Sequence, residues 1–156
     1  MNQARAKLLK DHEELDALLE RLSEDVEAPS QGELETTWAA LESRLLRHLE
    51  AEERFLLPLV EASNPAEVQR TLDEHARIRS SIAELGVAIE LHCARKPELV
   101  ELIRFLRAHA KHEDEALYQL AGDKASVAVE HSILETLKNA LRSATREPSL
   151  DRRARP

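Results

Sequence analysis

Glycine is scarce in this sequence, with three residues in 156, and aromatic side chains make up only 3% of it. Folds rich in strands need such chain breakers at their many turns, so the shortage of glycine argues against them. Hydrophobic residues account for 42% and charged residues for 33%, a balance that is typical of long amphipathic helices. Because the length suits a single domain, we expect one compact all-α domain.

Cysteine is limited to Cys93, which cannot form a disulfide within the chain, and this count is compatible with a reducing compartment. No apolar run approaches membrane-spanning length, and residues 1–10 lack the apolar core of a signal peptide. We therefore expect a cytoplasmic protein that does not bind membranes. The formal net charge is -8, and the sequence has no run of basic residues within the folded region. Nucleic acid is therefore not an expected partner.

Apolar residues recur at alternating spacings of three and four in four successive segments, which predicts one buried face on each of four helices. The expected inward positions are, in chain order, Leu8, His12, Leu15, Leu19, Leu22 and Val26; Leu34, Trp38, Leu41, Leu45, His48, Glu52, Phe55 and Leu59; Val68, Leu72, His75, Ile78, Ile82, Leu85 and Ile89; and Leu99, Leu102, Leu106, His109, Glu113, Ala116 and Leu120. Consecutive helices with short connections predict an antiparallel up-down four-helix bundle.

Proline, glycine and small polar residues mark the ends of these helices. Ser30 is the predicted N-cap of the second helix, and Asn64 followed by Pro65 predicts the start of the third. Gly122 is expected just after the end of the fourth helix. Pro58 lies inside the second helix and should bend its last turn or two.

A fifth amphipathic helix is expected over residues 124–143, capped by Asp123. The apolar residues available to pack it on the bundle are Val127, Ile133, Leu134, Leu137 and Leu141. Residues 145–156 are polar and basic without periodicity, so we expect them to be disordered. The predicted organisation is a helical bundle over residues 1–144 followed by this tail.

Six polar residues interrupt the apolar stripes of the four main helices. They are His12, His48, Glu52, His75, His109 and Glu113. A glutamate four residues after a histidine lies one turn along on the same face, so each His-x-x-x-Glu can direct two ligands to one point. Burying unpaired carboxylates is costly, and metal cations would remove that cost. Imidazole with carboxylate suits iron, zinc or manganese, and six ligands match two ions bridged by two carboxylates better than one tetrahedral zinc.

The order of these residues resembles the hemerythrin family, specifically bacterial hemerythrin-like proteins with a His, His-x-x-x-Glu, His, His-x-x-x-Glu pattern on successive helices. Flanking residues that also match are Asp11, Glu53, Leu56, Leu57, Pro58, Asp114, Leu117 and Tyr118. The resemblance spans roughly residues 5–120. It implies an up-down bundle that holds a non-heme di-iron centre, two iron ions joined by an oxo or hydroxo bridge.

Oxygen-carrying hemerythrins have a further histidine one turn after the third-helix histidine, and this chain has Arg79 there. The resemblance therefore implies the four-histidine relatives, which handle iron, oxygen, peroxide or nitric oxide. We expect a protein that binds or reacts with a small diatomic or peroxide ligand in sensing, scavenging or iron handling, with a redox partner if electrons are exchanged. Two alternatives stay open, an oxidoreductase with true turnover and a metal-stabilised interaction module.

Several polar residues near the stripes have more than one reading. Asp114 and His112 stay candidates for the metal shell, whereas His131 has no partner at ligand spacing. Asp16 either orients an imidazole or is a solvated charge.

Three other side chains are expected outside the site. Tyr118 should fill the rim of the core, and Cys93 should be a small, partly buried side chain. Arg79 should pair with an acidic residue on or near its own helix rather than with a bridging carboxylate. Its candidate partners are Asp73, Glu74 and Glu84.

Overall fold

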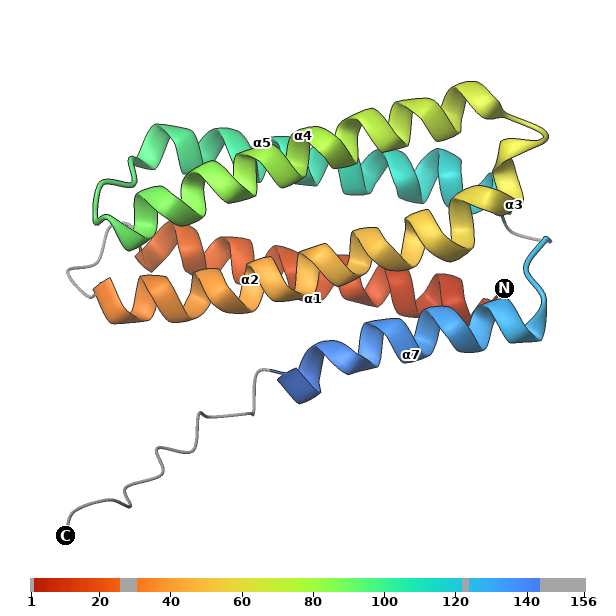
Figure 1. Ribbon diagram of the computed structural model, residues 1–156, viewed down its shortest axis with the longest axis horizontal. Coiled ribbons are helices and arrows are strands. Elements are labelled where there is room, and N and C mark those ends of the chain that lie inside the picture. Colours follow the sequence, from red (N-terminus) through yellow and green to blue (C-terminus); the bar gives the residue numbers. More distant parts are fainter. Residues whose placement is uncertain (1, 26–30, 122–123, 144–156) are drawn as a thin grey trace, which may run out of the picture.

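The computed structural model describes residues 2–25, 31–121 and 124–143, and every regular element in these ranges is helical. In chain order the elements are α1 (Asn2–Asp25), α2 (Gln31–Ala51), η1 (Glu52–Leu56), α3 (Leu57–Glu61), α4 (Pro65–Glu90), α5 (Lys96–His112), η2 (Glu113–Leu117), α6 (Tyr118–Ala121) and α7 (Val127–Ser143). Four long helical stretches run along one axis, and α7 lies outside them against α1 and α2 (Figure 1). The prediction of an all-α bundle with an added C-terminal helix is confirmed.

The core consists of two apolar clusters with a polar layer between them. The larger cluster includes Leu15 and Ile78, and the smaller one includes Leu8 and Val68. On α1, His12 stands between Leu8 and Leu15, so it separates the two clusters. The other five polar stripe residues occupy the same level of the bundle and are buried. Polar groups at this level are therefore shielded from water. Electrostatic interactions between them are stronger than they would be in solvent.

Two π-helical turns, η1 and η2, begin at Glu52 and Glu113. The backbone N–H of Leu57 donates to the Glu52 carbonyl, and the N–H of Tyr118 donates to the Glu113 carbonyl, each five residues back. Such a turn holds one more residue than an α-helical turn, so it moves every later side chain by one position. Both turns thus start at the glutamate of a His-x-x-x-Glu pair.

This shift corrects the predicted inward face beyond the two glutamates. The expected inward residues are only half-buried: Phe55, Leu59, Ala116 and Leu120. The residues one position later are fully buried instead: Leu56, Val60, Leu117 and Ala121. Pro58 stands in the first turn of α3, where a missing N–H is harmless, and the helix is already irregular before it, at η1.

The start of α4 follows the sequence prediction. The Asn64 side chain accepts a hydrogen bond from the Glu67 N–H at 3.3 Å, and Pro65 is the first helical residue. Leu72 was expected inside but is 38% exposed, and Thr71 is buried in its place. Residues 26–30, 122–123 and 144–156 lie outside the described ranges, and with them the predicted caps Ser30, Gly122 and Asp123, the inward position Val26 and the tail.

Helix α7 packs along α1 and α2 and adds to the smaller cluster (Figure 1). Ile133 and Leu137 are buried in that cluster, as predicted, and Leu134 is half-buried. Val127 was expected to pack on the bundle but is 83% exposed, because α7 begins only at that residue. The Leu141 side chain lies outside the described part of the structure.

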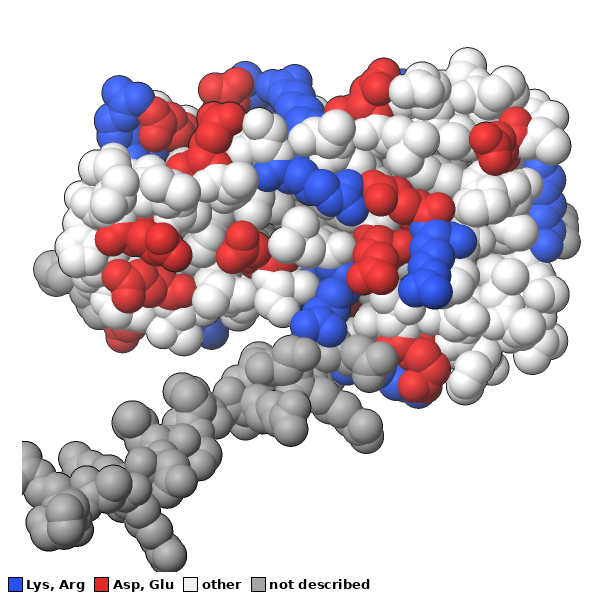
Figure 2. All heavy atoms as spheres, viewed as in Figure 1, with Lys and Arg blue, Asp and Glu red and all other residues white. Residues whose placement is uncertain are grey.

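Acidic and basic side chains are interspersed on the face shown in Figure 2, so neither sign dominates there. Within the described ranges, no helix combines the length and the apolar character that crossing a bilayer requires.

Candidate metal centre

The six polar stripe residues converge at one level of the bundle. They form two overlapping groups, His12, His48, Glu52 and Glu113, and Glu52, His75, His109 and Glu113. Within each group, one potential ligand atom per residue lies within 4.8 Å of all the others. We call the pair His12 and His48 the first half of the site and the pair His75 and His109 the second half. The sequence prediction that these six side chains meet is confirmed, while metal ligation by them stays a prediction.

The two glutamates lie between the two halves. Glu52 Oε1 lies 3.3 Å from His48 Nε2, and its Oε2 lies 3.4 Å from His75 Nε2. Glu113 Oε2 lies 3.4 Å from His12 Nε2, and its Oε1 lies 3.3 Å from His75 Nε2. Each carboxylate therefore presents one oxygen to each half, which is the arrangement of a carboxylate that bridges two ions.

The Nδ1 atom of each imidazole contacts a further carboxylate, which is neither Glu52 nor Glu113. These contacts to Nδ1 are His12 with Asp114 at 3.0 Å, His48 with Asp11 at 3.0 Å, His75 with Glu53 at 2.8 Å and His109 with Glu74 at 2.7 Å. An ionised carboxylate can only accept, so Nδ1 carries the proton in all four rings. Nε2 then faces the centre of the site, as in metal-binding histidines oriented by an outer carboxylate.

These outer carboxylates were not predicted, except for the possibility that Asp114 joins the metal shell itself. Each of these carboxylates is next in sequence to a central residue but accepts the hydrogen bond of a histidine on another helix. Asp11 precedes His12 and accepts from His48, and Glu53 follows Glu52 and accepts from His75. The other two follow the same rule. An acidic residue beside four of the six central residues is the signal that could have revealed them.

Two arginines extend this outer layer. Arg44 contacts Asp11 and Glu14 on α1. Arg79 donates to Glu53 through Nη1 at 2.5 Å and Nη2 at 3.1 Å. The expected pairing of Arg79 with Asp73, Glu74 or Glu84, on or near its own helix, is wrong, because Arg79 pairs with Glu53 of η1. Arg79 acts on the site through Glu53, which also holds His75.

Tyr118 lies inside the site and not at the rim of the core. Its hydroxyl donates to Glu52 Oε1 at 2.5 Å, and its ring stacks on that of His12, with ring centroids 5.7 Å apart. Burial and the charges of Glu52 and Glu113 raise the pKa of this phenol well above its usual value. The inward register set by η2 explains this position, which helical periodicity alone did not predict.

Buried charges shift the pKa values of the central groups. Burial alone would lower the pKa of His48, but the charge of Glu52 and the hydrogen bond to Asp11 outweigh it and raise this pKa to about 10. Burial is also outweighed at His75, whose pKa rises to about 10 through its contacts with Glu113 and Glu52. Burial would raise the pKa of Glu113, but the neighbouring imidazoles of His109, His12 and His75 hold it well below its usual value. The site thus concentrates negative charge that either protons or a cation must balance.

Three central atoms fit a cation better than a proton network. Glu52 Oε2, Glu113 Oε2 and His109 Nε2 are buried and have no hydrogen-bond partner among the described residues. An unsatisfied buried carboxylate oxygen is costly, and a bound cation would satisfy it directly. The residues present therefore fit a metal centre.

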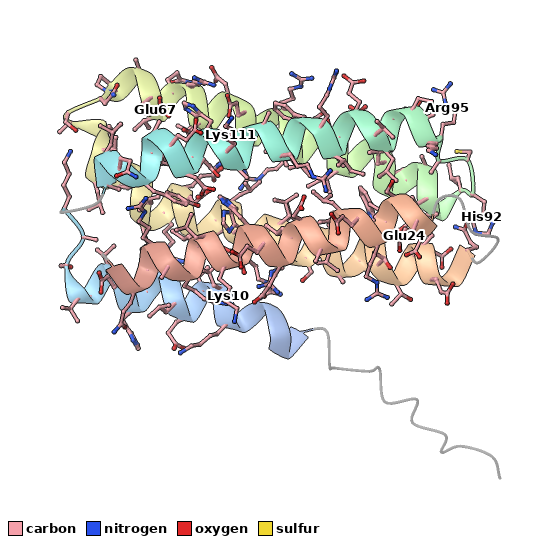
Figure 3. The ribbon with its side chains drawn as sticks, turned by 180° about the vertical axis from the view of Figure 1, so that it is seen from behind. Lys10, Glu24, Glu67, His92, Arg95 and Lys111 are labelled. Atoms are coloured by element: carbon pink, nitrogen blue, oxygen red, sulfur yellow. The ribbon has the colours of Figure 1, made fainter. Side chains whose placement is uncertain are left out.

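Three other residues considered near the site stay away from its centre. His112 contacts Glu67 of α4 at 2.6 Å, and Figure 3 shows Glu67 near the end of α5 that carries Lys111. Asp16 accepts from Arg107 at 2.5 Å and does not orient an imidazole. Cys93 is exposed, contrary to the prediction of a partly buried thiol, because it follows the end of α4.

A cavity of about 40 Å³ adjoins the site between α1, α2 and α5. His12, His48 and His109 form one side of it. The rest of its wall is mostly leucine: Leu15, Leu19, Leu41, Leu45 and Leu106. A cavity needs about 10–15 Å³ of this kind of volume to hold one water, so the space can take a small molecule. Asp16 and Arg107, which pair with each other, also line it, and the remaining apolar wall favours an uncharged molecule.

Comparison with known proteins identifies one family. The family model of the hemerythrin HHE cation-binding domain matches residues 3–121, which is more than half of the chain and includes all six central residues. Comparisons with curated proteins and with solved structures give no significant match.

Proposed function

The chain belongs to the hemerythrin HHE cation-binding domain family, and on this basis we propose that it is a non-heme di-iron protein that binds or reacts with a small oxidant. Oxygen, peroxide and nitric oxide are the candidate ligands. The observation that carries the proposal is the position of Glu52 and Glu113, each with one oxygen toward either half of the site. Two ions account for that position, whereas one ion would leave half of the imidazoles without a role.

The proposed ligands are His12, His48, His75 and His109, with Glu52 and Glu113 as bridges. The same donors also suit manganese and zinc, and zinc has no redox chemistry; we assign iron, which can exchange electrons with an oxidant. Bound iron would supply electrons to the oxidant. A reducing cytoplasm would keep such a centre reduced, and the single Cys93 is compatible with that compartment.

The protein's own groups support this function in two ways. The outer carboxylates hold the Nδ1 protons and fix the ring orientations, which improves the imidazoles as ligands. The cavity beside the site, lined mostly by leucine, leaves room for a small uncharged molecule.

Arg79 favours reaction over reversible oxygen carriage. Its guanidinium is held by Glu53 and cannot act as a metal ligand, so the half with His75 has no additional nitrogen donor from this position. We therefore propose that oxygen or peroxide oxidises the reduced protein and that oxygen is not taken up and released in repeated cycles.

The test is stopped-flow absorbance of the reduced, iron-loaded protein mixed separately with oxygen, hydrogen peroxide and nitric oxide. We expect rapid spectral changes with at least one of them and no recovery of the reduced spectrum after flushing with argon. Zinc-loaded protein is the control and should not react, because zinc has no redox chemistry. Sustained consumption under added reductant would identify an enzyme, whereas no reaction with any oxidant would contradict the proposal and favour a metal-stabilised interaction module.

A further inference from the structure

Tyr118 is the only tyrosine of the chain, and its side chain is completely buried. It is the first residue after the π turn η2, which moves it onto the inward face of its helix. π turns of this kind are frequent at functional sites. The position of this phenol is thus built into the irregular helix that also carries Glu113.

The Tyr118 oxygen is as close to the first half of the site as the proposed ligand atoms are to each other. Its Oη lies 2.5 Å from Glu52 Oε1, 3.3 Å from His12 Nε2 and 3.4 Å from His48 Nε2. The two Nε2 atoms of this half are 2.9 Å apart, and His48 Nε2 is 3.3 Å from Glu52 Oε1. Donor atoms bound to one ion at about 2.0–2.2 Å lie about 2.8–3.6 Å from their neighbours, the lower end for an octahedral ion and the upper end for a tetrahedral one. The two contacts of Oη with the imidazoles fall in this range, and the shorter contact with Glu52 is the hydrogen bond that the hydroxyl makes while it keeps its proton.

We propose that Tyr118 is a fifth protein ligand of the ion held by His12 and His48, bound through its phenolate oxygen. The inference rests on the proposed metal centre and deepens it. The hydroxyl proton, which now lies on the hydrogen bond to Glu52, passes to solvent when the ion binds. The charge of a bound cation stabilises the phenolate that the metal-free site disfavours.

The second half of the site has no equivalent donor among the described residues. The groups next to it, Glu53 and Glu74, face the Nδ1 atoms of His75 and His109, on the outer side of each ring. The two ions are therefore inequivalent, with five protein ligands at one and four at the other. The ion held by His75 and His109 keeps more positions for an external ligand.

The test is the visible absorption and resonance Raman spectrum of the ferric protein, compared with that of Tyr118→Phe. We expect a phenolate-to-iron charge-transfer band with enhanced phenolate ring modes, lost in Tyr118→Phe while both proteins keep the same iron content. Because the chain has one tyrosine, ring-deuterated tyrosine in the unsubstituted protein should shift these modes. This second measurement does not depend on how well the variant folds.

The outcomes distinguish a failure of Tyr118 as a ligand from a failure of the metal centre itself. If the unsubstituted protein binds two irons but shows no phenolate modes, Tyr118 only donates a hydrogen bond to Glu52, and the inference is wrong while the metal centre stands. Ring modes that do not shift on deuteration would overturn it equally. If the unsubstituted protein takes up no iron, the proposed function fails and this inference fails with it.

Discussion

The outer carboxylate Asp11 provides a sharp test of how the imidazoles are held. Its side chain is 1% exposed, accepts from His48 Nδ1 at 3.0 Å and contacts Arg44. In Asp11→Asn the amide cannot satisfy both neighbours. If its oxygen accepts from His48, its NH₂ group is left near the guanidinium, and if it turns around, the Nδ1 proton loses its acceptor.

The expected magnitude follows from the role of such carboxylates in metal sites. Losing one typically weakens metal binding by about 10- to 100-fold, or about 1.4 to 2.8 kcal/mol. We expect Asp11→Asn to fall in this range, because His48 would lose its fixed orientation and the hydrogen bond to Asp11, which, together with the charge of Glu52, raises its pKa. The effect should be on affinity and not on stoichiometry, since all six proposed ligands remain.

The assay is competition for iron or zinc with a chelator of known affinity, with circular dichroism as a check on folding. Glu14→Gln is the matched control, because Glu14 also contacts Arg44 but touches no imidazole. Its affinity should stay within about twofold of the unsubstituted protein. Equal losses in the two variants, or no loss in Asp11→Asn, would refute the assignment of Asp11 as the group that orients His48.

Three further predictions concern other parts of the molecule. Glu113→Ala should lose bound metal, because the substitution removes a proposed bridging carboxylate. His131 is exposed on α7, so His131→Ala should keep its metal. Equal metal content of the two variants, measured by mass spectrometry, would place the site elsewhere. In the metal-free folded protein, the pKa values of His48 and His75 are about 10, above the usual 6.5. The two imidazoles therefore contribute fully to stability below pH 6.5, and this contribution is lost as the pH rises through 10. Urea unfolding across this range should show falling stability, and a rise would show that these imidazoles are not protonated partners of the carboxylates. His92, labelled in Figure 3, lies two residues beyond the end of α4 and has a positive φ of 56°. His92→Gly should therefore raise the free energy of unfolding by about 1 kcal/mol, whereas His92→Ala should not. Equal effects of the two substitutions in thermal melts would exclude backbone strain as the cause.

The helices and the six central residues could be predicted because both depend on spacing within one helix. A stripe of apolar residues with His12 or His75 in it has the same periodicity whatever the neighbouring helices do. The start of α4 was predictable for a similar reason, since Asn64 and Pro65 act on adjacent backbone groups.

The remaining features depend on how helices are rotated against each other. The π turn at Glu113 changes the register without any change in the apolar pattern before it, so the burial of Tyr118 could not be read from period 3.6. Pairs such as Glu53 with Arg79 and His75 join different helices, and sequence spacing carries no information on such distances.

In the proposed metal centre, four imidazoles and two bridging carboxylates hold two iron ions. The most direct measurement is the metal content of protein loaded anaerobically with isotopically enriched iron, together with its Mössbauer spectrum after oxidation. We predict about two irons per chain with the spectrum of a magnetically coupled pair, because four imidazoles and two bridges exceed the needs of one ion. One metal per chain, or tetrahedral zinc with no uptake of iron, would contradict the claim.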